Sequence, residues 1–537
     1  MWIRRAAWTS PEPLGLWGQE RAVEALDRLV GAIQRGGHPR HLDMVRNNGI
    51  ATSAVEVAGA LARRMDDAHV QVAPHPTEAA LRGVGVRGLL ARADRSALVL
   101  DAHDLVADRA RLGAVIEAIV HGATTELPAT PGAATVTHAC AASIVLIGSD
   151  GARKALRDQD ARFDQLWDER VTLRSDLPRA PTEAAPVVAL LQRIAQDGHL
   201  GDVSLGAYAF VMEQLAGRPA RRDRVALDPN LARRILTEAR LSRGDEERLR
   251  SSDVEAAWAR LQWRGGTQEA AHRARLRRDQ LQMATTGEAV GVVNGLMVYG
   301  SGASSYSIPG RITARVSVGR HGIVNIEREA RYSGRSFDKG VFQLGSWLSA
   351  TFAPESHPLA VSASLVFEQN YGKVDGDSAT LAEAVALLSA LSGLPARQDV
   401  AMTGAMNQRG ELIAVGSLNL KIAGWWRTCR DRGDLTGQQG VLIPEASVGD
   451  LQVDREVVAD IAAGRFHVWV ASSIGEAVEL GLGRPAGVAE EPDADTVFGR
   501  ASRRLRSMSD RLYPPRKPPA PPAPRSGSSG NGDGKGA

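Results

Sequence analysis

The chain has 537 residues, 43% of them hydrophobic and 24% charged, and its formal net charge is +3. This length and apolar content predict two or three domains with real cores, which excludes a single small module. The two cysteines, Cys140 and Cys429, lie far apart without a CxxC pair, which argues against a disulfide framework and a thiolate metal site. We expect a cytoplasmic protein without a membrane span, because no signal-like apolar segment and no long uncharged apolar run occurs.

The first region, residues 1–172, alternates helical patterns with short apolar runs. An amphipathic helix is expected from Gln19 to Gln34, and strands are expected at 97–101 (ALVLD) and around 142–148 (ASIVLIG). Such alternation is typical of a sheet covered by helices. The sequence therefore predicts an α/β domain here.

The second region, residues 173–285, contains segments with 3.6-residue periodicity and few β-branched runs, such as APVVALLQRIA and PNLARRILTEARL. We expect a helical subdomain and linker. The third region, residues 286–485, returns to β-type segments and then has helices after Ser378 and Leu418. It predicts an α+β domain, so the fold class is multidomain α/β.

The C-terminal segment, residues 486–537, contains the net positive charge of the chain, which lies toward its end. From residue 503 on there are eight Lys or Arg against two Asp or Glu, so the rest of the chain is slightly acidic. Its Pro, Gly and Ser content predicts a disordered, solubilising or tethering tail. Binding of nucleic acid by this tail is the less favoured alternative.

Ser378 stands at a chemically useful place in YGKVDGDSATLAEAVALLSALSGLP, residues 371–395. The apolar spacing predicts a helix that begins at Ser378 or just after it, with Thr380 and Glu383 at capping-box spacing. The positive end of a helix dipole stabilises a developing oxyanion, as acylation of a serine requires. The alternative interpretation is that Ser378 only caps the helix.

A serine hydroxyl needs a base to accept its proton, and Lys421 is the candidate. It lies in the first turn of a second expected helix, in the segment GSLNLKIAGWWRTCRD, flanked by apolar residues. Burial and a helix N-terminus both favour the neutral amine. The alternative is an exposed lysine on an amphipathic helix. No HExxH or GxSxG motif occurs, so zincin and α/β-hydrolase chemistry lack their signatures, and no metal or cofactor is expected.

The segment around these two residues resembles the proteolytic domain of Lon proteases, family S16, most closely the LonB and LonC branches with serine in a GDSA context. In that family serine and lysine form a catalytic dyad with the spacing found between Ser378 and Lys421. The resemblance implies that Thr403 orients the lysine and that Asp375 influences its protonation. Glu329 is a further active-site neighbour that it suggests.

The N-terminal region resembles the AAA+ motor of the same proteins but departs from its nucleotide-binding motifs. The segment VRNNGIATSAV places Ile50 and Ala51 where the phosphate loop has glycine and lysine. Asp101 keeps the Walker B aspartate, whereas Ala102 replaces the glutamate that activates water. A degenerate AAA+ module that does not hydrolyse ATP is therefore expected.

Together these features predict an ATP-independent serine endopeptidase that cleaves unfolded or small polypeptides inside an oligomeric chamber, a hexamer as in the family. Two alternatives stay open from the sequence. One is an ATP-dependent protease with an unorthodox nucleotide loop. The other is a non-proteolytic AAA-like scaffold or chaperone.

Overall fold

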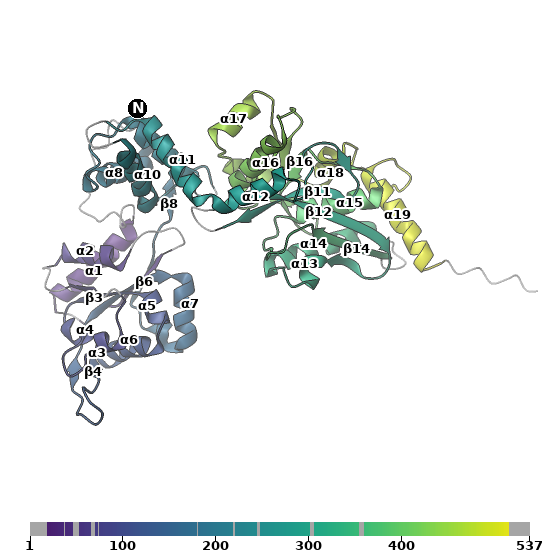
Figure 1. Ribbon diagram of the computed structural model, residues 1–537. Coiled ribbons are helices and arrows are strands. Elements are labelled where there is room, and N and C mark those ends of the chain that lie inside the picture. Colours follow the sequence, from purple (N-terminus) through teal and green to yellow (C-terminus); the bar gives the residue numbers. More distant parts are fainter. Residues whose placement is uncertain are drawn as a thin grey trace, which may run out of the picture.

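The computed structural model arranges the chain as an α/β part, a helical part and a larger mixed part, in chain order (Figure 1). It describes residues 19–36, 38–46, 53–65, 70–72, 75–179, 181–218, 221–243, 248–300, 305–353 and 359–514, and the backbone alone of 181–186. The mixed helix and sheet composition confirms the predicted α/β class. Within these residues, no helix combines the length and apolarity needed to span a bilayer.

The α/β part is built on a five-stranded parallel sheet in the order β2-β3-β6-β1-β7. Alternate residues of the strands face two separate cores, one against α1 and α2 and the other against α3 to α7. The expected helix at 19–34 and strand at 97–101 are confirmed. The elements are β1 (Leu42–Arg46), β2 (Val70–Val72), β3 (Ala97–Asp101), β6 (Ser143–Ser149), β7 (Glu169–Thr172), α1 (Glu20–Gln34), α2 (Ala54–Ala62), α3 (Glu78–Arg82), α4 (Leu89–Arg92), α5 (Ala102–Val106), α6 (Arg109–His121) and α7 (Asp150–Gln159), with the hairpin β4 (Ala123–Thr125) and β5 (Thr137–Ala139) and the 3-10 helix η4 (Ala161–Gln165).

The helical part packs four helices and a short two-stranded antiparallel sheet around one apolar core, as the periodicity predicted for the helices. Its elements are β8 (Asp176–Pro178), α8 (Pro181–Asp197), α9 (Leu205–Ala216), β9 (Arg224–Ala226), α10 (Pro229–Arg243) and α11 (Ser251–Gly265). Gly266 interrupts the helix before α12 (Thr267–Arg277), which leads into the mixed part (Figure 1).

The mixed part contains a seven-stranded sheet in the order β13-β14-β12-β11-β16-β19-β20. Alternation within β16 divides its residues between two cores: Val400 and Met402 face α15, whereas Ala401 faces α16. The sheet and its main helices are β11 (Val292–Tyr299), β12 (Tyr306–Val318), β13 (Gly322–Asn325), β14 (Val361–Phe367), β16 (Val400–Met402), β19 (Gly440–Pro444), β20 (His467–Ala471), α14 (Arg335–Phe352), α15 (Thr380–Ser392) and α16 (Leu418–Arg432). The smaller elements are β10 (Glu288–Ala289), α13 (Ile326–Glu329), β15 (Ala396–Arg397), β17 (Ala405–Met406), β18 (Leu412–Ile413), η6 (Glu445–Asp450), α17 (Arg455–Ala462) and α18 (Ile474–Leu482).

The expectation that the chain is disordered from residue 486 is wrong for the helix α19 (Val497–Leu512). Val497, Ala501, Leu505 and Met508 recur at helical spacing and enter the same core as α15. The arginines between them, which suggested a tail, lie on the opposite face. The folded mixed part therefore extends beyond 485, and residues 515–537 lie outside the described part.

Candidate active site

Ser378 lies two residues before the start of helix α15, as the sequence predicted. The helix begins at Thr380, whose hydroxyl donates to the carbonyl of Asp377 at 2.7 Å, and it ends at Gly393 in the left-handed conformation (φ 71°). The expected capping box with Glu383 is wrong, because no side chain caps the start of α15 and the Glu383 side chain is buried in the interior. The positive end of the helix dipole nevertheless lies beside Ser378.

Lys421 is the fourth residue of α16 and is only 4% exposed. Leu418, Ile422 and Trp425 belong to the apolar cluster around it. The structure therefore favours the buried amine over the exposed, amphipathic alternative. A lysine is seldom buried this completely without a specific partner.

Three side chains meet at the end of β16, where the strand stops at Met402. The Nζ atom of Lys421 lies 2.9 Å from Ser378 Oγ and 3.0 Å from Thr403 Oγ1. The Thr403 hydroxyl donates to the carbonyl of Ser378 at 3.2 Å, and the amide of Gly404 donates to the same oxygen at 2.9 Å. The serine is thus held through its backbone while its hydroxyl contacts the amine.

Burial lowers the pKa of Lys421 from 10.5 to about 8, and the nearby Asp377 carboxylate opposes this by favouring the ammonium form. At that pKa about a tenth of the amines are neutral at pH 7. A neutral amine at 2.9 Å can accept the serine proton, which an ammonium group cannot. The site can therefore activate a hydroxyl near physiological pH.

The Asp375 carboxylate bonds to backbone amides and not to Lys421. It accepts hydrogen bonds from the amides of Gly376, Ser336 and Phe337 at 2.8, 3.1 and 3.3 Å. The last two amides belong to the first turn of α14, which has no cap of its own. The bond from Gly376, followed by those from α14, lowers the pKa of Asp375. Asp375 thus caps α14, and the carboxylate charge that acts on Lys421 is that of Asp377.

The structure does not bring Glu329 to this site, because its side chain is exposed at the end of α13. Sequence reasoning assigned Glu383 to a capping box and missed its burial: it is only 1% exposed in the first turn of α15. Burial, and then the nearby Glu327, raise the pKa of Glu383 to about 8, while Asn325 Nδ2 donates to it at 3.1 Å. The signal was one acidic residue within an otherwise apolar helix.

At the carboxyl edge of the parallel sheet, where α/β folds bind ligands, polar groups bond to one another. Arg46 and His103 both contact the Asp101 carboxylate, at 3.0 and 2.9 Å, and the other ring nitrogen of His103 lies 3.2 Å from Ser149 Oγ. Ala102 is fully buried beneath them. Ile50 and Ala51 lie outside the described residues. No cluster of three or more His, Cys, Asp or Glu side chains that could hold a metal occurs in the described ranges.

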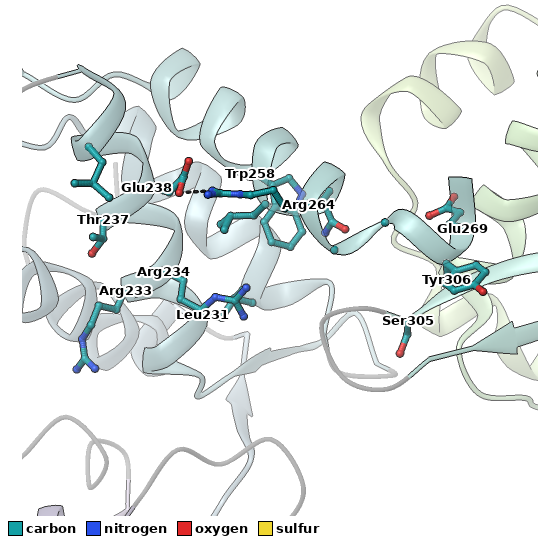
Figure 2. Close-up of a pocket in the computed structure, with 15 residues that line it drawn as sticks. Leu231, Arg233, Arg234, Thr237, Glu238, Trp258, Arg264, Glu269, Ser305 and Tyr306 are labelled. Carbon is teal, nitrogen blue, oxygen red and sulfur yellow. Dashed lines mark ion pairs between the residues drawn. The ribbon is translucent and has the colours of Figure 1, made fainter. Parts of the chain in front are cut away.

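A separate cavity of 670 Å³ lies between α10, α11 and the start of β12 (Figure 2). Trp258 and Tyr306 border it, and an ion pair joins Glu238 to Arg264 at its rim. Neither Ser378 nor Lys421 lines it. This cavity is therefore not part of the candidate active site.

Comparison with known proteins agrees with this geometry. Residues 370–482, which include Ser378, Thr403 and Lys421, match the Lon protease (S16) C-terminal proteolytic domain. This segment is therefore similar to a Lon-type proteolytic domain over the residues that hold the three contacting side chains.

Proteins similar to this chain include "Putative Lon protease homolog" of Escherichia coli (strain K12), 32% identical over 53% of this chain and 49% of that protein. The protein of the same description from Haemophilus influenzae is 39% identical over 38% and 34%. "Archaeal Lon protease" of Halobacterium salinarum is 26% identical over 62% and 45%. The chain thus spans half or less of the length of these relatives.

Proposed function

We propose that this protein is a serine endopeptidase in which Ser378 is the nucleophile and Lys421 the general base. The observation that carries the proposal is the 2.9 Å contact between the serine hydroxyl and an amine that is 4% exposed. A contact of this length allows direct proton transfer, and burial supplies the neutral base. Thr403, bonded to both partners, holds the amine in line with the hydroxyl.

The proposed reaction has two stages. Ser378 Oγ attacks the peptide carbonyl while its proton passes to Lys421 Nζ, and the resulting ammonium protonates the leaving amine, which departs to leave an acyl-serine. The neutral amine then takes a proton from water, which hydrolyses the ester and restores Ser378. The dipole of α15 stabilises the oxyanion in both stages.

We further propose that cleavage does not depend on ATP. Asp101, the position expected to bind a magnesium nucleotide, is engaged by Arg46 and His103, and buried Ala102 offers no carboxylate to activate water. Without a motor, substrates must arrive unfolded or small. The resemblance to the family supports a homo-oligomeric chamber, a hexamer, around the sites.

The test measures cleavage of fluorescent casein and of a stably folded protein by the wild type, Ser378→Ala and Lys421→Ala, with and without MgATP. The expected result is casein cleavage by the wild type alone, at equal rates with and without nucleotide, while the folded protein survives. Stimulation by ATP contradicts the proposal that cleavage does not depend on ATP. Cleavage by Ser378→Ala contradicts the assignment of the nucleophile. Native mass spectrometry tests the hexamer.

A further inference from the structure

The turn that starts the lysine-bearing helix α16 is held from outside the helix. Ser417, its first flanking residue, is in the left-handed conformation (φ 57°) and its side chain makes no capping bond. A non-glycine residue in this conformation costs about 1 kcal/mol and persists only when surrounding contacts maintain it. Lys421 lies four residues further on, with its amide bonded to the carbonyl of Ser417 at 3.1 Å. Whatever fixes this turn therefore fixes the lysine backbone.

Those contacts come from one segment, residues 447–452. The amide of Val415, before the turn, donates to the fully buried hydroxyl of Ser447 at 3.2 Å. After the turn, Asn419 Nδ2 donates to the carbonyl of Asp450 at 3.1 Å, and Asn419 Oδ1 accepts from the amide of Gln452 at 2.8 Å. The nitrogen and the oxygen of the Asn419 side-chain amide thus both bond to backbone partners. These hydrogen bonds hold the turn on both sides, and Asn419 lies two residues before Lys421.

The same segment reaches the helical part of the chain. The Gln452 side-chain amide bonds the carbonyl of Glu213 in the last turn of α9 at 3.3 Å. In the flipped orientation it bonds Ala216 and Gly217 instead, so either orientation ties it to the end of α9. Arg455, at the start of α17, pairs with Glu213 at 2.6 Å and with Glu255 of α11 at 3.4 Å. A short chain of contacts therefore links α9 and α11 to Asn419.

Apart from this link, open space separates the helical part from α16. A cavity of 720 Å³, bordered by Asn419 and Leu420 on one side and by Trp258 and Gln262 on the other, separates α16 from α11. The helix breaks at Gly266, between Arg264 and Glu269 (Figure 2). Beyond the break, α12 is fixed to α16 by the two-bond pair of Arg273 and Asp431. The ion pairs of Arg455 are solvent-exposed, and such pairs contribute at most about 1 kcal/mol.

We propose that Asn419 is a positioning residue for Lys421, and that through Gln452 and Arg455 it couples the docking of the helical part to the alignment of the serine and lysine. The inference rests on the proposed function of the pair. A displacement of about 1 Å between reacting groups can reduce turnover by about 100-fold, so a modest loosening of this turn is measurable. The helical part thus sets the activity of the proteolytic site without touching it.

The first test compares wild type, Asn419→Ala and Ser447→Ala with Asn230→Ala, which removes an asparagine of α10 remote from the site. For Asn419→Ala and Ser447→Ala, the two pin variants, we expect kcat on casein to fall about tenfold while KM changes less than about twofold. The reason is that the turn aligns the reacting groups without binding substrate. Hydrogen exchange of residues 413–424 is measured on the same proteins. Faster exchange confined to that segment is expected in the pin variants and not in the control.

The second test addresses the coupling. Arg455→Glu places like charges beside Glu213 and Glu255, and we expect a few-fold loss of kcat with faster exchange at 413–424. Adding Glu213→Lys restores an opposite pair and is expected to recover part of both. Wild-type kcat and exchange in Asn419→Ala overturn the positioning role, and an unaffected Arg455→Glu overturns the coupling. If the wild type shows no Ser378-dependent cleavage, the proposed function fails. The exchange of residues 413–424 still tests whether Asn419 and Arg455 hold the turn before Lys421.

Discussion

The pH dependence of cleavage follows from the buried amine. Because the pKa of Lys421 is lowered to about 8, the neutral fraction rises from about 1% at pH 6 to about half at pH 8. If the neutral amine is the base, kcat/KM rises roughly fifty-fold over this interval and its midpoint reports the lysine in the free enzyme. Without burial the midpoint would lie near 10.5.

Asp377→Asn tests the electrostatic part of this reasoning. The Asp377 carboxylate favours the ammonium form, so its removal lowers the pKa of Lys421 and moves the midpoint to lower pH. The contacts of Asp377 with Thr380 use its backbone carbonyl, which the substitution keeps. Glu445→Gln, an exposed change of equal charge on η6, serves as the control. Initial rates at low casein concentration are measured from pH 5.5 to 9.5. An unchanged midpoint in Asp377→Asn, or a flat profile in the wild type, refutes the reasoning.

Four further predictions concern stability and alignment. Thr403→Val lowers kcat at least tenfold without unfolding the protein, because the amine loses the hydroxyl at 3.0 Å that orients it; wild-type kcat contradicts this. Lys421→Met raises the melting temperature at pH 7, since it removes a desolvation cost of up to about 3 kcal/mol that disappears above pH 10.5; a gain that grows with pH argues against a lowered pKa. Glu383→Gln stabilises the protein more at pH 9 than at pH 5, because folding raises the pKa of Glu383 from 4.5 to about 8 and the resulting destabilisation of the wild type grows with pH between these two values; equal gains at both pH values contradict a buried, protonated carboxyl. Asp375→Ala lowers the free energy of unfolding by about 1 kcal/mol by uncapping α14, and Asp375→Asn, which keeps an acceptor oxygen, recovers most of it; equal losses in both variants speak against capping.

Periodicity and spacing predicted those parts of the molecule that depend on local pattern. The apolar run of residues 97–101 forms β3. Helix α10 begins at Pro229, and α15 ends just before Gly393. The pairing of Ser378 with Lys421 was foreseen through resemblance to a family, because no local pattern brings together residues 43 positions apart. Their distance depends on how β16 ends between two helices.

The errors came from contacts that are remote in sequence. The influence of Asp375 on the lysine was implied by the family resemblance, whereas in the structure its carboxylate accepts from the first-turn amides of α14. Glu383 matched a local capping pattern, yet a polar partner on another element, Asn325, draws it into the interior. The helix α19 was hidden because its four apolar anchors alternate with arginines in a stretch that leads into Pro and Gly. Asn419 gave no signal at all, since its partners lie beyond residue 447.

The proposed mechanism requires that the buried, neutral amine of Lys421 activates the hydroxyl of Ser378. Labelling with a fluorophosphonate across pH 6 to 9, followed by peptide mass spectrometry, tests it without any assumption about substrate or nucleotide. We predict a single adduct on Ser378, a labelling rate that rises with a midpoint near pH 8, and loss of labelling in Lys421→Met. An adduct on another residue, or labelling of Ser378 that persists at the wild-type rate in Lys421→Met, would contradict it.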